Sequence, residues 1–485
     1  MGTRRAMAPA IGLLTVGFVV LAFGVSSRPP EIRASAQAFF NFDRPGINAH
    51  NSPAVAADPA HPRTVALVDR IDTPQFSCSV SLSGDLGNQW TPVPVPLPPE
   101  APNCFWPGVG FDADGRMLVL YTATGGRFNL PVGVWLQRFH RTTPEGPPVK
   151  VAGTEAFHAH MAVEGSSVLV AYVQATPDTA GRGLGFSPGP NPVMAVRSAD
   201  AGRSFLPPVA VSDGARRAVV PNVELGPGGK AVVVALDLGD DVADYEATHE
   251  GQGGAPDNRP WSIVAFRSED GGASFAPPTT VAADLVPPQR IIVNLAPVPG
   301  LGRDPATGRV YATWDAGRGD RRDVFVASSG DNGATWSTPV AVVRRDGMQH
   351  LPGVDVAPDG RVDVVFYDHS ADPLGARTEV AMASSWDQGA TFTTATVSDR
   401  SFDARLGYGS IQGIPVLSSQ LAVLSAPGRA LTFWSDTRRA TQDDNATELA
   451  EAVVLTRQTA GRRWIVAALG LAVLAAGVVL GLRAL

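Results

Sequence analysis

Short runs of alternating apolar and polar residues, separated by turns that contain Gly or Asp, recur along the whole chain. VDVAPDGRVDVVFYD (354–368) and LAPVPGLGRDPATGRVYATWD (295–315) each contain two such runs. Alternation with a period of two is typical of β-strands with one buried face, and a short turn between two runs predicts a hairpin. Hairpins of this form begin near Ser52, Trp106, His158, Val220, Ile291, His350 and Ile411. The pattern therefore predicts an all-β chain of seven similar units.

A second pattern, Ser-x-Asp-x-Gly-x-x-(Trp/Phe), occurs five times at a spacing similar to that of the hairpins. The copies occupy 83–90, 198–205, 268–275, 329–336 and 385–392. They resemble the Asp-box, or bacterial neuraminidase repeat, of the sialidase-like β-propellers. The resemblance implies a turn between the third and outer strands of a blade, in which Asp accepts hydrogen bonds from backbone amides, Gly has a positive φ and the aromatic residue packs between sheets. It gives a structural role to Asp85, Asp200, Asp270, Asp331 and Asp387.

The resemblance predicts a propeller at residues 37–457, and it raises the question of how the ring closes. Well-characterised sialidases have six blades, so six stays an alternative to the seven units counted here. The second and last units lack the repeat, and the last also lacks an outer strand. We expect QAFFNFD (37–43) to supply that strand, because closure removes exposed sheet edges. A turn cannot join strands from opposite ends of the chain, which would explain the missing last repeat.

Apolar segments at both ends predict export and membrane attachment. Residues 1–36 contain Arg4 and Arg5, an apolar run and an Ala-x-Ala triplet, which is the pattern of a signal peptide or an uncleaved signal anchor. The stretch 464–482 is apolar and long enough to span a bilayer, so 458–485 is interpreted as a C-terminal transmembrane anchor. The expected location is the cell membrane, with the propeller on the extracytoplasmic side.

Charge and cysteine content narrow the possible partners. The 485 residues carry a formal net charge of −7 that is dispersed along the chain, which argues against a nucleic-acid partner. Cys78 and Cys104 are the only cysteines, and in an exported protein they fit one disulfide between neighbouring units better than two free thiols. No metal motif is present, so no cofactor is expected. Asp240, Asp241 and Asp244 leave Ca²⁺ as an alternative to a flexible acidic loop.

Polar and aromatic residues gather where the topology predicts one face of the ring, opposite the repeats. Strand starts and strand ends place His50, His158, His160, Asp315, His350, Asp368 and Asp436 on this face as candidate binding residues. The four histidines among them, which come from three blades, could also bind a metal, although histidines at strand starts usually form hydrogen bonds to neighbouring loops. The carboxylates that follow aromatic residues have a simpler alternative role, which is to cap strand ends.

Sialidases of the resembled family use an arginine triad, an Asp acid/base and a Tyr nucleophile activated by Glu. Tyr408 occupies a last-blade position similar to that nucleophile, Arg217 and Arg290 begin adjacent blades, and Glu224 is a candidate partner. The family's leading arginine has no counterpart in INAHNSPAVAADP (47–59). The sequence therefore offers candidates for about half of the catalytic residues that this family uses.

Two functions follow from these features. The first is a membrane-anchored propeller that binds a glycan or protein at the cell surface without catalysis. The alternative is a sialidase-like exo-glycoside hydrolase, and whether the chain is an enzyme stays open at this point. Three arginines that converge on one Tyr–Glu pair over the channel would favour the enzyme.

Overall fold

The computed structural model describes residues 30–40, 49–72, 76–125, 130–175, 191–214, 217–239, 260–285, 299–318, 321–373, 377–406, 417–418, 420–441 and 446–457. The chain divides into two compact units, and the larger, Ala34–Val454, contains almost all described residues. The smaller unit joins Met1–Arg33 to Leu455–Leu485, and its described residues are the ends of two strands. No helix among the described residues is long and apolar enough to cross a membrane. The export segment before residue 30 and the anchor at 464–482 lie outside them.

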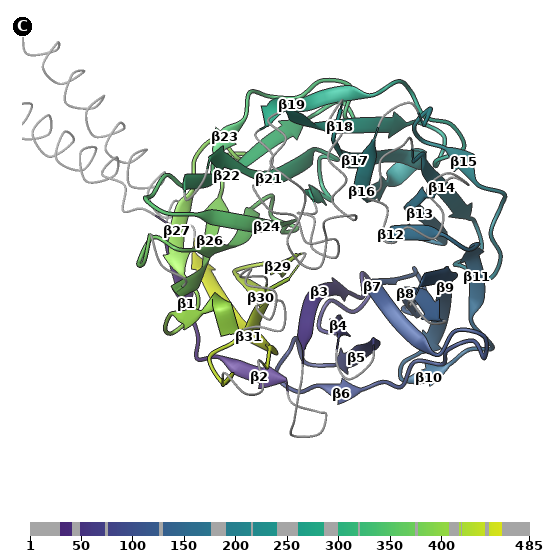
Figure 1. Ribbon diagram of the computed structural model, residues 1–485, viewed down its shortest axis with the longest axis horizontal. Coiled ribbons are helices and arrows are strands. Elements are labelled where there is room, and N and C mark those ends of the chain that lie inside the picture. The colour runs from purple at the N-terminus through teal and green to yellow at the C-terminus, as the bar shows by residue number, and fades with distance from the viewer. Residues whose placement is uncertain are drawn as a thin grey trace, which may run out of the picture. The chain divides into compact units, whose positions relative to one another are not determined.

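Seven antiparallel sheets form the larger unit, as the hairpin count predicted, and they are arranged as blades around a centre (Figure 1). Blades 1 to 4 contain, in this order, β3 (His50–Ala57), β4 (Val65–Ile71), β5 (Ser77–Ser83) and β6 (Thr91–Pro92); β7 (Asn103–Phe111), β8 (Met117–Gly125), β9 (Leu130–His140), β10 (Thr143–Pro144) and β11 (Val149–Ala152); β12 (Ala156–Glu164), β13 (Ser167–Gln174), β14 (Val193–Ser198) and β15 (Val209–Ala210); and β16 (Ala218–Gly226), β17 (Lys230–Asp237), β18 (Trp261–Ser268) and β19 (Thr279–Leu285).

Blades 5 to 7 follow the same order. They contain β20 (Gly300–Arg303), β21 (Val310–Arg318), β22 (Arg321–Ser329) and β23 (Val340–Ala341); β24 (Gln349–Val356), β25 (Val362–Asp368), β26 (Arg377–Ser385), β27 (Thr393–Thr396) and β28 (Phe402–Asp403); and β29 (Ala422–Ala426), β30 (Arg429–Asp436) and β31 (Glu448–Arg457) with β1 (Glu31–Ala34) and β2 (Ala38–Phe40). The first strand of each blade is innermost. Apolar residues between neighbouring sheets form the core.

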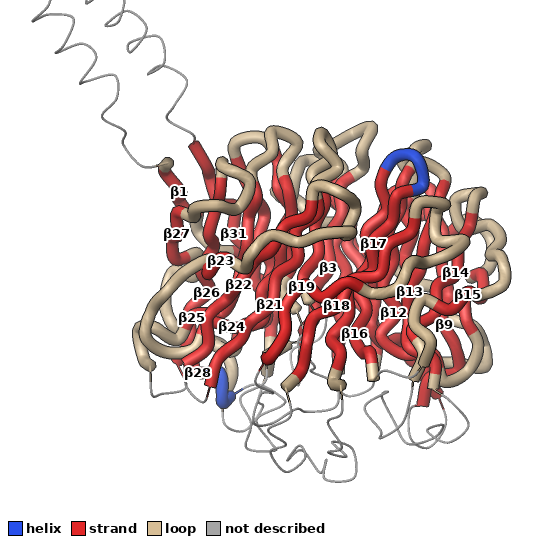
Figure 2. Tube along the Cα trace, turned by 90° about the horizontal axis from the view of Figure 1, so that it is seen from above, coloured by secondary structure: helices blue, strands red, loops and turns tan. Residues whose placement is uncertain are grey.

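The strands run between two faces of the larger unit, which Figure 2 shows edge-on. We call one the turn face, because it carries the first-to-second strand turns and the five repeats, and it includes the 3₁₀ turn η1 (Pro227–Gly229). The other is the loop face, which carries the second-to-third strand loops, the starts of the inner strands and η2 (Ala404–Leu406). Candidate binding residues from the sequence belong to the loop face.

The N-terminal segment closes the ring. β2 pairs with β31 in antiparallel register, Ala38 opposite Glu451 and Phe40 opposite Leu449. This strand lies within the 37–43 segment expected to donate it. β1 also pairs with β31. This strand was not expected, because its residues fall within the predicted export segment 1–36. Phe40 is buried, and its ring lies 5.4 Å from that of Trp90 in blade 1, so the added strand packs across the seam.

The five repeats form turns with one hydrogen-bond pattern, and we call them Ser-Asp turns. In blade 5, the Thr335 amide donates to Asp331 Oδ1 (2.9 Å) and the Gly333 amide donates to Ser329 Oγ (2.8 Å). The serine is therefore a second acceptor, a role that the pattern had not revealed. The residue between Asp and Gly is also left-handed, as Asn332 is with φ 58°. Each turn thus has two consecutive positive-φ residues.

A disulfide joins Cys78 in β5 to Cys104 in β7, with their Cα atoms 5.5 Å apart. The two strands belong to blades 1 and 2, so the bond links adjacent blades. Blade 2 itself has no Ser-Asp turn. A two-residue connection between β9 and β10 replaces it, and its Arg141 has a φ of 54°.

Candidate functional site

Five inner strands share one irregularity near the loop face. In β3, β7, β12, β16 and β24 the pairing with the second strand shifts register close to the strand's start. The residue at each shift has a positive φ between 45° and 53°, and these residues are Ser52, Trp106, His158, Val220 and Leu351. Bulges of this kind re-aim side chains, and left-handed bulky residues are unfavourable unless their surroundings enforce them. The same bulge therefore recurs in five blades at the loop-face end of the central channel, which we call the channel mouth.

A cavity of ≈ 200 Å³ lies in the channel directly below these bulges. All seven inner strands or the residues that precede them contribute to its wall. Most of the wall is backbone and apolar side chain, including Pro53 and Met161. The polar and aromatic groups in it come from Trp106, His160, Asn222 and Gln420.

Trp106 and His160 of this wall form a ring cluster with His158, which does not line the cavity. The indole centroid of Trp106 lies 4.9 Å from the imidazole of His158 and 5.8 Å from that of His160. The Trp106 ring also lies 6.2 Å from the ring of Phe105, and the guanidinium of Arg70 lies 4.5 Å from the Phe105 ring. Burial lowers the pKa of His158 to about 3 and that of His160 to about 4, so both imidazoles are neutral at neutral pH.

Asn222 fixes the tautomer of His160. The Asn222 side-chain amide donates from Nδ2 to the carbonyl of Pro299 (3.1 Å), so its Oδ1 is an acceptor. That oxygen accepts from the Val223 amide (2.9 Å) and faces His160 Nδ1 at 3.3 Å. His160 Nδ1 must then carry the proton, which leaves Nε2 as an acceptor. This Nε2 has no hydrogen-bond partner among the described residues. His160 could be named from the sequence, whereas Asn222 could not, because its only signal is its place two residues after a bulge.

The other histidines of the loop face interact with each other or with carboxylates. His350 and His369 approach through their Nε2 atoms at 3.2 Å, and burial lowers the pKa of His350. His50 Nδ1 lies 2.5 Å from Asp69 Oδ2. Among the described residues no group of His, Cys, Asp and Glu is arranged to hold a metal ion. The acidic cluster Asp240, Asp241 and Asp244 lies outside the described residues.

The three candidate carboxylates are held by neighbouring groups of the protein itself. Asp315 pairs with Arg322 at 2.6 Å, and Asp368 pairs with Arg345 at 2.7 Å. Asp436 accepts from the Trp434 indole (2.9 Å) and pairs with Arg438. All three carboxylate side chains are buried, and so are the side chains of the partners Arg322 and Arg438, whereas Arg345 is exposed. Such pairing supports strand ends. The geometry therefore favours the capping interpretation of these residues over ligand binding.

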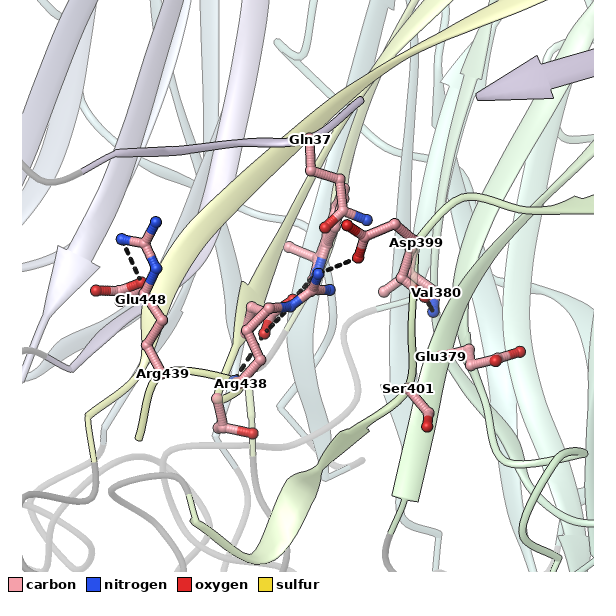
Figure 3. A network of polar contacts seen from close by, with 12 residues as sticks. Gln37, Glu379, Val380, Asp399, Ser401, Arg438, Arg439 and Glu448 are labelled. Carbon is pink, nitrogen blue, oxygen red and sulfur yellow. Dashed lines mark hydrogen bonds and ion pairs between the residues drawn. The ribbon is translucent and has the colours of Figure 1, made fainter. Parts of the chain in front are cut away.

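Arg438 extends this pairing across the seam between blades 6 and 7, and its neighbour Arg439 pairs within blade 7, as Figure 3 shows from close by. Arg438 also forms an ion pair with Asp399, and Arg439 forms one with Glu448 at 3.3 Å. Gln37, just before β2, donates to the carbonyl of Val397. This network joins the last blade and its donated strand to blade 6.

The candidate catalytic residues do not assemble among the described residues. Arg217 is mostly buried just before β16, on the loop face, whereas Glu224 lies seven residues further along the same strand. At about 3.3 Å per residue the two are separated by about 20 Å. Burial raises the pKa of Glu224 to about 8, with Arg303 opposing the shift and Asp355 adding to it. Tyr408 and Arg290 lie outside the described residues.

No protein-family model matches the sequence, and no curated protein sequence matches it significantly. Solved structures do match. An ulvan lyase of polysaccharide lyase family 25 has 13% identity and a TM-score of 0.51, with 88% of this chain and 98% of the lyase covered. The lectin BP39L from Burkholderia pseudomallei has 13% identity and a TM-score of 0.46 over 72% of this chain and 84% of the lectin. A Trypanosoma rangeli sialidase has 12% identity and a TM-score of 0.41 over 84% and 54%. At these identities the likeness to the lyase establishes the propeller fold.

Proposed function

We propose that this protein is a glycan-binding propeller of the Asp-box type, and that it binds a neutral sugar unit at the loop-face end of its channel without catalysis. The observation that carries the proposal is the neutral His160, which lines the cavity beside Trp106 and whose buried Nε2 has no hydrogen-bond partner among the described residues. A neutral imidazole can accept from a sugar hydroxyl, and an aromatic ring offers the apolar surface against which sugar rings lie.

Charge at the channel mouth supports a neutral ligand. The two histidines of the ring cluster are neutral, and the carboxylates Asp315, Asp368 and Asp436 are paired with arginines. An anionic sugar would require guanidinium groups free to hold it in two places. The cavity, at ≈ 200 Å³, is smaller than the range of about 300–1,000 Å³ typical of sites for drug-sized ligands. One sugar unit of a longer chain is therefore the expected occupant.

The two terminal segments suggest where in the cell the protein would bind its glycan. We assign 1–36 to export and 458–485 to a membrane anchor on their sequence patterns. The propeller would then be displayed on the extracytoplasmic side, where glycans of the cell surface or the environment are its partners. The Ser-Asp turns support the Asp-box assignment through their shared hydrogen bonds.

A glycan array probed with purified protein tests the proposal, together with His160→Phe and the control Lys230→Phe, an exposed residue at the start of β17 on the turn face. We expect the wild type and the control to bind the same glycans. His160→Phe should bind about three- to tenfold more weakly, because one neutral hydrogen bond is lost. Binding by His160→Phe at wild-type strength would contradict the site.

Fluorogenic glycosides test the absence of catalysis. Turnover of a sialoside by the wild type, abolished in Tyr408→Phe, would establish the hydrolase instead. The expected result is no turnover of any glycoside in the panel.

A further inference from the structure

The Ser-Asp turns seal the seams between blades on the turn face, and one seam lacks such a seal. In five seams the turn glycine packs against the preceding blade. A Cβ on Gly272 would lie 2.5 Å from Leu169 of blade 3, and one on Gly202 would lie 2.7 Å from Leu136 of blade 2. Blade 7 has no such turn, but on the turn face its seam with blade 6 is closed by Arg361 of the β24–β25 turn, which donates to the carbonyls of Ala426 (3.0 Å) and Arg429 (2.8 Å). Blade 2 has only the short β9–β10 connection.

A pocket of ≈ 580 Å³ lies at this unsealed seam between blades 1 and 2. Its walls are the β3–β4 turn and the start of the Ser-Asp turn of blade 1, with the β7–β8 and β9–β10 connections of blade 2. Leu82, Phe111 and Met117 supply its apolar part. Its volume falls within the range of about 300–1,000 Å³ typical of small-molecule sites.

The charges in this seam pocket favour an anion. Its two carboxylates are already engaged, because Asp58 accepts from the Ala60 amide (2.9 Å) and faces His61 (3.0 Å), while Asp114 pairs with Arg116. The exposed guanidinium groups of Arg63 and Arg141 have no hydrogen bond or ion pair with a side chain among the described residues. Arg63 interacts with Asp85 only by a weak electrostatic attraction, which contributes least to the lowered pKa of that carboxylate. Two arginines around an apolar pocket form a site that carboxylate or sulfate oxygens fit.

We infer that the seam pocket is a second binding site, distinct from the channel, for a carboxylate-bearing saccharide. The missing Ser-Asp turn of blade 2 creates the space, and Arg63 and Arg141 supply the charge. The inference does not depend on the proposed function, since the pocket lies on the opposite face from the channel mouth.

Calorimetric titration of the full chain with trigalacturonate tests this inference, with maltotriose as the neutral comparison. We expect trigalacturonate to bind, maltotriose not to bind at this site, and added NaCl to weaken binding. Arg141→Gln should weaken binding about tenfold, because a charge-assisted hydrogen bond is lost. The matched control is Arg203→Gln, an exposed arginine in the Ser-Asp turn of blade 3 that does not line the pocket.

A second variant blocks the space without touching the charges. Gly84 lines the pocket, its φ is not positive and a Cβ there would meet nothing within 4 Å. The equivalent residue of the blade 6 turn is Trp386, so a large side chain fits this turn position. Gly84→Trp should abolish trigalacturonate binding at unchanged thermal stability. Failure of the wild type to bind trigalacturonate, or undiminished binding by Gly84→Trp, would overturn the inference.

Discussion

At the scale of single residues, the propeller depends on small polar side chains that satisfy turn amides. Asp331 shows this most clearly, because both of its carboxylate oxygens accept from Thr335, one from the amide and one from the hydroxyl. These hydrogen bonds, led by that of the Thr335 side chain, lower the pKa of Asp331 to about 2. The carboxylate is therefore ionised throughout the physiological range.

Asp331→Ala should reduce the free energy of unfolding by about 1–3 kcal/mol, because the amide loses its acceptor. Urea denaturation of the variant measures the loss. The control is Asp346→Ala, which removes an exposed carboxylate paired only with the exposed Arg321 and should change stability by less than about 1 kcal/mol. Equal stability of both variants would exclude a structural role for the turn aspartate.

Glu224 gives the protein a pH dependence of a specific sign. Burial raises its pKa in the folded state to about 8, from an ordinary value of 4.5 for glutamate. The folded state thus binds more protons than the unfolded state between these values, and stability falls as pH rises through this window.

Glu224→Gln should remove this contribution, so the variant gains stability relative to the wild type on the order of 2 kcal/mol at pH 9 and little at pH 4. Urea denaturation at a series of pH values measures it. Asp355 and Glu451 also have raised pKa values, to about 6 and about 7, and remain in both proteins. A difference between the two proteins that does not change with pH would rule out a buried, protonated Glu224.

At the scale of strands and turns, the ring is closed by residues that come before the first blade. Phe40 of β2 is 6% exposed and packs between Trp90 of blade 1 and Phe433 of blade 7. Its neighbour Phe39 faces the other side of the strand, where its ring meets the guanidinium of Arg439 at 4.2 Å. Phe40 therefore contributes to core packing, whereas Phe39 makes a contact near the surface, and substituting each in turn distinguishes the two contributions.

Phe40→Ala should cost about 3–5 kcal/mol of unfolding free energy, as expected for a large buried side chain, whereas Phe39→Ala should cost about 1 kcal/mol. Thermal and urea unfolding measure both. If Phe40→Ala were no more damaging than Phe39→Ala, the donated strand would not be part of the core.

The strands and the closure could be predicted because they depend on local signals, namely alternation, Gly turns and a missing partner strand. β1 was hidden because its residues, EIRA, follow an apolar run whose export pattern dominates that region. The inner-strand bulges were also missed. Four of them precede a proline, as in Trp106-Pro107 and Leu351-Pro352, and proline prevents the preceding residue from adopting the α region. These prolines could be seen in the sequence, but a following proline does not by itself indicate that the preceding residue has a positive φ.

At the scale of the whole molecule, the two faces have different roles. Placing residues on faces from topology brought His158 and His160 together correctly, because strand starts converge at the channel. It could not show which carboxylates are already paired, since no pattern in the sequence links Asp315, Asp368 and Asp436 to their partners Arg322, Arg345 and Arg438. It also could not reveal the seam pocket, which depends on the turn that blade 2 lacks.

The central claim is that a sugar hydroxyl donates to the free acceptor of His160. Imidazole ¹⁵N NMR of the protein, titrated with a glycan selected on the array, tests it most directly. The account predicts that Nδ1 stays protonated at neutral pH and that the Nε2 resonance moves toward that of a hydrogen-bonded acceptor as the glycan saturates the protein. An unchanged Nε2 resonance at full glycan occupancy, or a proton on Nε2 in the free protein, would contradict it.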